Sequence, residues 1–372
     1  MITIFKKLKR LINAYNEYLK LKRTSKLFNK NISRKKIIIH IENSDIYNRY
    51  FYTFLKFFSI EGYTIYFPRL NFQYFRNNIY KRNLQPWNYY NLIFKEGLIS
   101  LDSVPAKSKL DIEITDKNLS ADFFTNFFKM EFEFDNVYVP MTMHPLFYHY
   151  KYWDRQIKLL NKRKHSVFMI GNLDRCQYED FKNKPFNINS RIEVFDYLKR
   201  TKKIKEIESN EQLDFFIDGD NDLEIILLDS KSVYIEMSKL RETISRFSFY
   251  LALAGVAMPF SHNLIEALSV GTIPIIQKNY AKLMIPNLVH MKNAIIYNDL
   301  EDLTFKIDIA FNLNTEKIDE LINNVLLYYN SNLLPTSVVN KVRKNQNRLI
   351  YLQAEHLSVK ILENNIFSKK LD

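Results

Sequence analysis

The sequence predicts an α/β protein built from two Rossmann-like βαβ domains that face each other across a cleft. Two observations predict it. Short apolar runs typical of buried parallel strands alternate with segments of helical periodicity, and 372 residues suffice for about two domains. We expect a basic amphipathic helix at 1–36, domains at 37–150 and 151–335, and a helical tail at 336–372.

The first domain is predicted from the strand, helix and strand at its start. The run IIIHIE at 37–42 is apolar enough for a buried strand, a helical pattern follows at 49–60, and a second strand is expected at 63–67. This order implies a parallel sheet. Further strands are expected at 90–94, 97–101, 110–115 and 136–139. The proline- and aromatic-rich segment at 140–153 is expected to be the crossing that connects the two domains.

The second domain shows the same alternation of apolar runs and helical patterns. Its first strand is predicted at 166–170, and a helix follows at 190–200. The later elements are expected as strands at 213–217, 223–228, 247–254 and 272–277, and as helices at 235–245 and 261–270.

The positive charge is concentrated at the start of the chain. Residues 1–36 carry twelve Lys and Arg residues against the single acid Glu17, a net charge of +11 out of +13 for the whole chain. Apolar side chains recur there at three- and four-residue spacing and predict an amphipathic helix: Ile4, Phe5, Leu8, Leu11, Ile12, Tyr15, Tyr18 and Leu19. Such a helix can lie on an anionic membrane surface. The alternatives are a helix packed on the protein body and a nucleic-acid-binding arm.

The composition argues against several classes of protein. Cys176 is the only cysteine, so an intrachain disulfide is impossible and a reducing compartment is favoured. No apolar run has the length of a transmembrane helix or the form of a secretory signal. We therefore expect a cytoplasmic protein, peripheral on the inner face of the cytoplasmic membrane. We expect no nucleic-acid partner, because the basic residues are not spread over a folded face.

The most informative segment is SRFSFYLALAGVAMPFSHNLIEALSVGTIPIIQ at 245–277. A buried strand is predicted to end near Gly255, and after a short loop Ser261 is a good helix N-cap. The start of that helix offers backbone N–H groups and the positive end of the helix dipole, which suit a phosphate group. Glu266 lies further along the same helix. Because ligands of open α/β sheets bind beyond the carboxyl ends of the strands, this segment is predicted to hold a nucleotide.

This segment resembles the carboxyl-terminal domain of exostosin-like glycosyltransferases and, more loosely, other transferases of the GT-B fold. The family pattern combines a Ser-x-Phe strand, a Gly loop, a Ser, Glu-Ala-Leu and Gly-x-x-Pro. Its counterparts here are Phe247, Phe249, Gly255, Ser261, Glu266-Ala267-Leu268 and Gly271-Thr-Ile-Pro274. The strand SVFMIGN at 166–172, with Arg191 in the next helix, is similar to the opening strand of that domain.

The resemblance implies a metal-independent glycosyltransferase that uses a nucleotide-sugar donor and no further cofactor. By analogy, Glu266 would accept hydrogen bonds from the donor ribose, and Ser261 with the N–H groups after it would hold the diphosphate. The predicted donor-binding residues are Gly171, Asn172, Arg191, Arg246, Ser261, His262, Asn263 and Glu266, and Arg175 is a further available cation.

The chain departs from the family pattern at three positions. Ala254 and Asn263 stand where the exostosin pattern often has arginine, and Met258 stands where retaining GT-B enzymes often carry a first glutamate. The phosphate charge must therefore be met by other cations, and the identity of the donor stays open.

An inverting transferase needs a general base beside the acceptor hydroxyl, usually Asp, Glu or His. We rank Asp45, after the first strand, ahead of Asp102, after the strand at 97–101, and His144, in the crossing segment. A retaining mechanism would not require this base. The expected acceptor is a bacterial surface glycan or its lipid-linked form: lipopolysaccharide, lipooligosaccharide or capsule.

Two alternatives to a glycosyltransferase stay open: a transferase of similar fold that moves a polyol phosphate, and a non-catalytic GT-B scaffold at the membrane. No metal is expected. Asp218, Asp220 and Asp222 resemble a D-x-D metal motif but are more simply a tight turn, and the sequence has no P-loop, GxGxxG or zinc-ligand spacing.

Overall fold

The computed structural model describes residues 2–28, 35–42, 49–74, 89–105, 109–128, 136–157, 163–178, 185–202, 204–354 and 356–368. The chain forms two compact units. Unit 1 comprises Met1–Val139 together with Pro335–Asp372, and unit 2 comprises Pro140–Leu334. The division thus falls before the predicted crossing segment, and the tail belongs with the first part of the chain.

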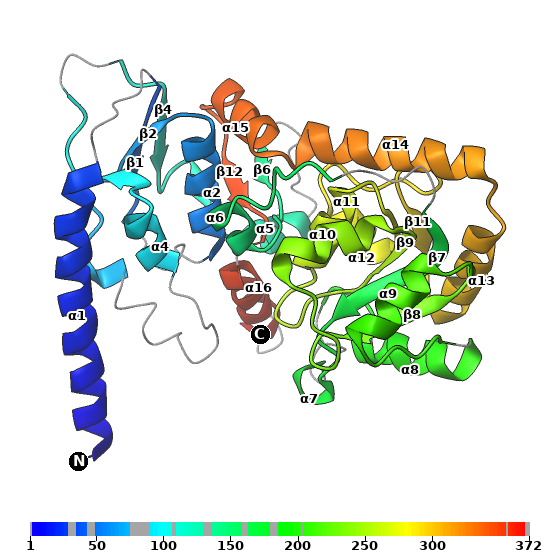
Figure 1. Ribbon diagram of the computed structural model, residues 1–372. Coiled ribbons are helices and arrows are strands. Elements are labelled where there is room, and N and C mark those ends of the chain that lie inside the picture. Colours follow the sequence, from blue (N-terminus) through cyan, green and yellow to red (C-terminus); the bar gives the residue numbers. More distant parts are fainter. Residues whose placement is uncertain are drawn as a thin grey trace. The chain divides into compact units, whose positions relative to one another are not determined.

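Unit 1 is built on a parallel sheet with the strand order β3-β2-β1-β4 (Figure 1). Its central strand β1, Lys36–His40, pairs with β2, Thr64–Tyr66, on one side and with β4, Ile112–Thr115, on the other; β3, Ile99–Ser100, is an edge. The helix α2, Arg49–Ile60, connects β1 to β2. Its buried face is aromatic because Phe51, Phe54, Phe57 and Phe58 all have 1% exposure or less.

The tail of the chain completes a second sheet of unit 1. Its strand β12, Ile350–Leu352, lies between β5, Leu119–Ser120, and β6, Val137–Val139, and is parallel to both. Two tail helices flank β12 in sequence: α15, Pro335–Lys344, packs on α2, and α16, His356–Ser368, packs on α5, Phe123–Phe128. The predicted helical tail therefore contains a strand that its helical periodicity concealed.

The N-terminal helix α1, Ile2–Phe28, packs against α4, Tyr89–Lys95, and β3 within unit 1. The contact is made from the middle of the helix, where Ala14 and Tyr18 are buried. The Tyr15 ring meets the Phe72 ring edge-on at 5.0 Å between centroids. In Figure 1 the amino-terminal half of α1 continues past α4.

Unit 2 contains a five-stranded parallel sheet with the order β11-β10-β9-β7-β8. The central pair is β7, Lys164–Gly171, and β9, Phe247–Ala252, and every residue of β9 is buried. On its other side β9 pairs with β10, Ile273–Gln277, and the edges of the sheet are β8, Ile225–Asp229, and β11, Ile295–Tyr297. Together with unit 1, this sheet confirms the predicted α/β class with parallel βαβ units.

Helices connect and cover the strands of unit 2 (Figure 1). One group of helices that pack together consists of α10, Met237–Ser245, α11, His262–Leu268, and α14, Thr315–Asn332. A second group consists of α8, Arg191–Thr201, and α13, Leu300–Phe311. The shorter helices are α6, Pro145–His149, α7, Arg175–Tyr178, α9, Asn210–Asp218, and α12, Lys278–Leu283. None of the described helices has the length and apolar character needed to cross a membrane.

Two predicted strands are helices in the structure. Residues 90–94 belong to α4 and residues 213–217 to α9. Both runs are apolar and short, and such runs do not distinguish a strand from a buried helix by periodicity alone. In α9 the helix is selected locally, because the Ser209 hydroxyl caps it by accepting from the Gln212 amide, and Leu213 and Phe216 are buried while Phe215 is exposed.

We predict that Ser358→Ala destabilises unit 1. The buried Ser358 hydroxyl of α16 accepts a 2.7 Å hydrogen bond from the Phe124 amide in the first turn of α5. Removal of this acceptor leaves a buried N–H without its partner, which costs about 1–3 kcal/mol. Denaturant titration of the full chain measures the loss, with the exposed Ser230→Ala as control. Equal stability of both variants would show that water or another group replaces the hydroxyl.

Candidate functional site

The candidate site lies at the carboxyl ends of β7 and β9 in unit 2. Counted from β8, the sheet follows the order second, first, third, fourth, fifth strand of the unit. The direction of winding therefore reverses between β7 and β9, and doubly wound sheets bind ligands in the crevice at this reversal. β7 ends there at Gly171, and β9 ends at Ala252, shortly before the loop that contains Gly255.

Arg191 occupies this edge of the sheet from the first position of α8. The helix start is fixed by a capping box, in which Ser190 and Glu193 exchange side-chain and backbone hydrogen bonds. The guanidinium is buried, with 7% exposure, and donates from Nε to the Ala254 carbonyl and from Nη2 to the Ser261 hydroxyl, both at 2.9 Å. Among the described residues no carboxylate forms an ion pair with Arg191.

Gly171 makes room for that guanidinium. A Cβ atom at this position would lie 2.1 Å from Nη1 of Arg191, so a side chain larger than hydrogen requires the arginine to move. The sequence pattern predicted Gly171 and Arg191 as two independent donor-binding residues. The structure shows that the glycine is needed because the arginine packs directly on the last residue of β7.

The loop after β9 is closed by backbone contacts at Gly255. Its N–H donates to the Pro259 carbonyl at 3.2 Å, and a Cβ there would lie 2.7 Å from the Phe260 carbonyl oxygen. Ser261 ends the loop with its amide donating to the Tyr280 hydroxyl at 2.8 Å. Its own hydroxyl makes no capping bond to α11, because it accepts from Arg191.

Glu266 is a buried carboxylate on the same helix. It is 2% exposed, and its Oε1 accepts a 3.2 Å hydrogen bond from the His144 amide. Burial raises the pKa of Glu266 from its ordinary 4.5 to about 7, although the His144 hydrogen bond and the positive charge of Arg241 oppose the rise. A buried carboxylate with so few donors can accept further hydrogen bonds from a ligand.

Two histidines stand next to this carboxylate. The rings of His144 and His262 are half-buried and meet edge-on with 5.2 Å between centroids. His262 Nδ1 lies 2.8 Å from the Thr142 carbonyl oxygen, which can only accept, so the neutral ring carries its proton on Nδ1 and its lone pair on Nε2. His144 Nδ1 accepts from the Leu146 amide at 3.4 Å, so its neutral ring carries the proton on Nε2.

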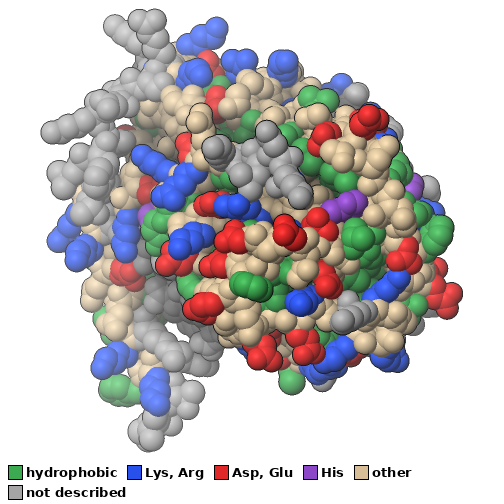
Figure 2. Space-filling model, turned by 45° about the vertical axis from the view of Figure 1, so that its right-hand side comes forward, with side chains coloured by type: hydrophobic (Ala, Val, Ile, Leu, Met, Phe, Trp, Pro, Cys, Tyr) green, Lys and Arg blue, Asp and Glu red, His purple; other side chains and the backbone are tan. Residues whose placement is uncertain are grey.

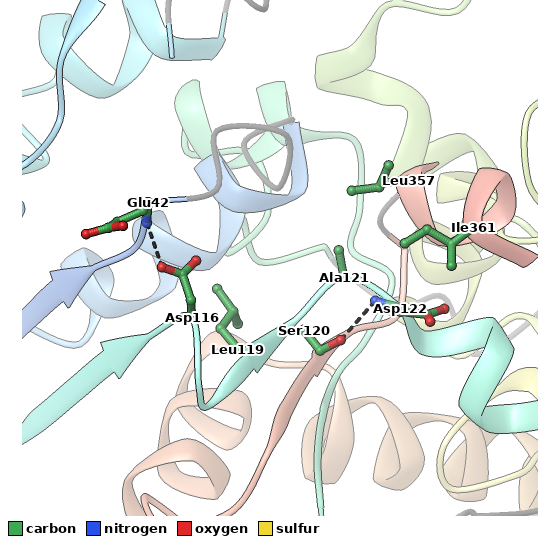
Figure 3. Close-up of a pocket in the computed structure, with 8 residues that line it drawn as sticks. All are labelled: Glu42, Asp116, Leu119, Ser120, Ala121, Asp122, Leu357 and Ile361. Carbon is green, nitrogen blue, oxygen red and sulfur yellow. Dashed lines mark hydrogen bonds between the residues drawn. The ribbon is translucent and has the colours of Figure 1, made fainter. Parts of the chain in front are cut away.

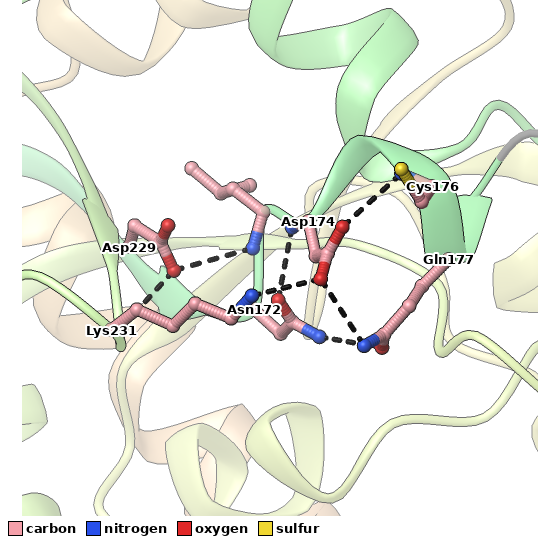
Figure 4. A network of polar contacts seen from close by, with 7 residues as sticks. Asn172, Asp174, Cys176, Gln177, Asp229 and Lys231 are labelled. Atoms are coloured by element: carbon pink, nitrogen blue, oxygen red, sulfur yellow. Dashed lines mark hydrogen bonds and ion pairs between the residues drawn. The ribbon is translucent and has the colours of Figure 1, made fainter.

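Asn263 and Asn172 serve the framework of the site. Asn263 Nδ2 donates to the Ile170 carbonyl and ties α11 to the end of β7. Asn172 organises the loop after β7, where it accepts from the Asp174 amide at 2.9 Å and donates to Gln177 at 2.7 Å (Figure 4). Lys231 completes this network with a 2.8 Å ion pair to Asp174, whose pKa it holds below the usual value.

The prediction of Arg246 as a donor-binding cation is corrected by its position. Arg246 caps the carboxyl end of α10 and immediately precedes β9, whereas the site lies at the far end of that six-residue strand, roughly 20 Å away. Its guanidinium is 3.7 Å from Glu242. Arg175, the further candidate cation, forms an ion pair with Asp196, because it donates to both carboxylate oxygens at 2.8 and 2.6 Å.

A pocket of about 430 Å³ lies at the corresponding edge of unit 1 (Figure 3). There the winding reverses between β1 and β4, which end beside Glu42 and Asp116. The Glu42 amide donates to Asp116 at 2.7 Å, and the Asp122 amide donates to the Ser120 hydroxyl at 3.1 Å. The remaining lining is apolar: Leu119, Ala121, Leu357 and Ile361.

The three residues predicted as general base fall in different places. Asp45 lies outside the described residues. Asp102 follows the edge strand β3 and exchanges hydrogen bonds with Ser100; it does not line the pocket at β1 and β4. His144 belongs to unit 2 and stands beside Glu266. Sequence reasoning missed Asp116 and Asp122, although Asp116 directly follows a strand that was predicted.

No group of three or more His, Cys, Asp or Glu side chains suited to a metal ion occurs among the described residues. The D-x-D-like stretch begins in the last residue of α9 and continues into the connection from α9 to β8. Asp218 is the last residue of α9, and Asp222 accepts a 2.8 Å hydrogen bond from the His165 amide.

Comparison with known proteins finds no matching family model and no matching curated sequence. Among solved structures, the chain is similar to an alpha-glucosyltransferase in complex with UDP and DNA, at 13% identity and a TM-score of 0.38, over 84% of this chain and 99% of that one. It is also similar to Anabaena HepE in complex with UDP and glucose, at 9% identity and a TM-score of 0.36, over 85% of this chain and all of that one.

A third similar structure is the N-terminal domain of Candida albicans trehalose-6-phosphate phosphatase, at 14% identity and a TM-score of 0.33, over 90% of this chain and 75% of that one. At such identities and TM-scores, neither the ligands nor the activities of these proteins carry over to this chain. The exostosin-like resemblance stays a prediction.

We predict that Gly171→Ala destabilises unit 2 by about 1–3 kcal/mol, the usual cost of overpacking, because the new methyl group would overlap the Arg191 guanidinium. Gly219→Ala is the control, since its Cβ would meet the Phe215 carbonyl oxygen at 3.2 Å, which requires a shift of only a few tenths of an ångström. Denaturant titration compares the two. If Gly171→Ala were as stable as Gly219→Ala, the guanidinium would not need to lie against β7.

We predict that Glu266 makes stability fall as pH rises from about 4.5 to about 7, because the unfolded carboxyl loses its proton near 4.5 and the folded one only near 7. Below 4.5 both states are protonated, and the contribution is fully present. Glu266→Gln lacks this titration, so its free energy of unfolding relative to wild type should rise by about 2.5 kcal/mol between pH 5 and 8. Parallel pH profiles of the two proteins would show that Glu266 titrates normally; the exposed Glu206→Gln is the control.

Proposed function

We propose that this chain is a glycosyltransferase of the GT-B kind, which binds a nucleotide-sugar donor in unit 2 and transfers the sugar to an acceptor held by unit 1. One observation carries the proposal. A buried carboxylate, Glu266, and a buried arginine without a carboxylate partner among the described residues, Arg191, both stand on elements that meet at the winding reversal between β7 and β9.

The ribose of the donor fits the chemistry of Glu266. Vicinal hydroxyls are hydrogen-bond donors, and an ionised carboxylate offers about four lone-pair positions, of which the His144 amide occupies one. Ribose binding stabilises the ionised form and so lowers the pKa that burial has raised. The same logic makes donor affinity fall as pH drops below neutrality.

The diphosphate of the donor fits the positive charge of Arg191. A cation buried without a counter-ion is costly, and a diphosphate beside the loop at Gly255 and Ser261 would offset that cost. Arg191 also fixes this loop through the Ala254 carbonyl and the Ser261 hydroxyl. It thus takes over the charge that arginines at positions 254 and 263 would supply in the exostosin pattern.

We further propose that the reaction is inverting and needs no metal. A histidine then removes the proton from the acceptor hydroxyl. His144 and His262 are the candidates beside Glu266, and His262 has the more suitable tautomer, because its lone pair lies on Nε2 while Nδ1 is held by Thr142.

For the acceptor we propose a bacterial surface glycan such as lipopolysaccharide, lipooligosaccharide or capsule, bound in the cytoplasm by unit 1. Its pocket supports a ligand rich in hydroxyl groups, because Glu42, Asp116 and Asp122 provide acceptors and the apolar wall can pack against a sugar ring. A polyol-phosphate donor would use the same diphosphate site, and a non-catalytic scaffold would retain the fold alone.

The decisive experiment is thermal unfolding of the full chain in the presence of UDP, GDP, CMP and their sugar conjugates. We expect one nucleotide base to raise the melting temperature, because a ligand at one hundred times its Kd adds about 2.7 kcal/mol. Glu266→Gln and Arg191→Lys should each reduce that shift, and the exposed Glu301→Gln should not. The absence of a shift with every compound at millimolar concentration would refute donor binding, and an undiminished shift in Glu266→Gln would place the nucleotide elsewhere.

A further inference from the structure

The helix α1 has two apolar faces, which adjoin at Tyr15. Ala14 and Tyr18 pack on unit 1, with the Tyr18 ring 5.9 Å from that of Phe72. A second face points to solvent along the amino-terminal half, where Phe5 is 75%, Leu8 53% and Ile12 53% exposed. Tyr15 lies between the two faces, because it is 46% exposed and its ring meets that of Phe72. Their spacing of three and four residues puts Phe5, Leu8 and Ile12 on one side of the helix.

Basic side chains border the second face. Lys9 is four residues after Phe5 and three before Ile12, so it lies directly beside both. Lys6, Lys9, Lys20, Lys22 and Arg23 are all exposed. The helix as a whole has eight Lys and Arg residues and one acid, Glu17. In the centre and on the right of Figure 2, by contrast, positive and negative side chains are interspersed.

We propose that the face formed by Phe5, Leu8 and Ile12 docks on an anionic lipid surface. Large apolar side chains beside lysines suit the boundary between lipid headgroups and acyl chains, where the apolar groups enter the hydrocarbon and the ammonium groups contact phosphate. The charge selects this occupant over a second copy of the chain, because two such helices in contact would bring sixteen cations against two acids.

The way α1 is attached permits this docking without a change in unit 1. Ala14 and Tyr18 hold the middle of the helix, and the amino-terminal half with Phe5 and Leu8 continues past α4 (Figure 1). A membrane-bound α1 would keep unit 1 at the lipid surface. The inference does not depend on the proposed activity, since it concerns residues remote in sequence from the donor-binding residues.

Sedimentation with lipid vesicles tests the proposal on the full chain. Wild type should sediment with vesicles of phosphatidylglycerol and phosphatidylcholine, and much less with phosphatidylcholine alone. Binding should weaken at high salt, because exposed charges are screened. Phe5→Ser/Leu8→Ser/Ile12→Ser should lower the partition coefficient by about tenfold or more, and Lys6→Gln/Lys9→Gln should lower it on anionic vesicles only.

The chain offers a matched control for the apolar triple variant. Phe215, Tyr234 and Leu327 are 80%, 71% and 63% exposed and lie in unit 2. Phe215→Ser/Tyr234→Ser/Leu327→Ser removes the same number of exposed apolar side chains and should bind vesicles like wild type, whereas equal losses in both triple variants would overturn the proposal. Undiminished binding of the α1 triple variant, or equal binding of wild type to neutral and anionic vesicles, would also overturn it. The same holds if wild type binds no vesicles but forms a dimer that the α1 triple variant converts to a monomer.

Discussion

The contact between Arg191 and Gly171 is the constraint on which the candidate site depends. The guanidinium lies against the last residue of β7 in space that only a glycine leaves open, and from there it reaches the Ala254 carbonyl and the Ser261 hydroxyl. One side chain thereby joins the ends of both strands at the winding reversal to the start of α11. The same helix carries Asn263 and Glu266.

The charged side chains around that contact differ in whether they have a partner of opposite charge. On the exposed surface of unit 2, cations are paired with acids, as Arg175 is with Asp196 and Lys231 with Asp174. Inside, Arg191 binds neutral oxygens, and Glu266 binds a neutral amide. Buried charges that lack direct counter-ions are costly in an unliganded protein and mark positions where a ligand can supply the missing partner.

Much of this arrangement could be predicted from the sequence. The strand, Gly loop, Ser cap and Glu-Ala-Leu helix at 245–277 have strong local signals, and the helix from Arg191 begins where Ser190 and Glu193 form a capping box. The donor-binding role predicted for Arg246 was wrong, because Arg246 precedes the six-residue strand β9 while the loop follows that strand. Asp122 and β12 were missed because their environment comes from chain segments more than two hundred residues apart, which no local pattern reports.

The central place of β12 in its sheet has a consequence for synthesis on the ribosome. Unit 2 is one continuous stretch, Pro140–Leu334, and its five strands are all available before β12 is made. Unit 1 begins earlier but must wait for Ile350–Leu352 to join β5 and β6. The nascent chain therefore completes its second unit first, and the earlier part exposes the edges of two unjoined strands until translation reaches the tail.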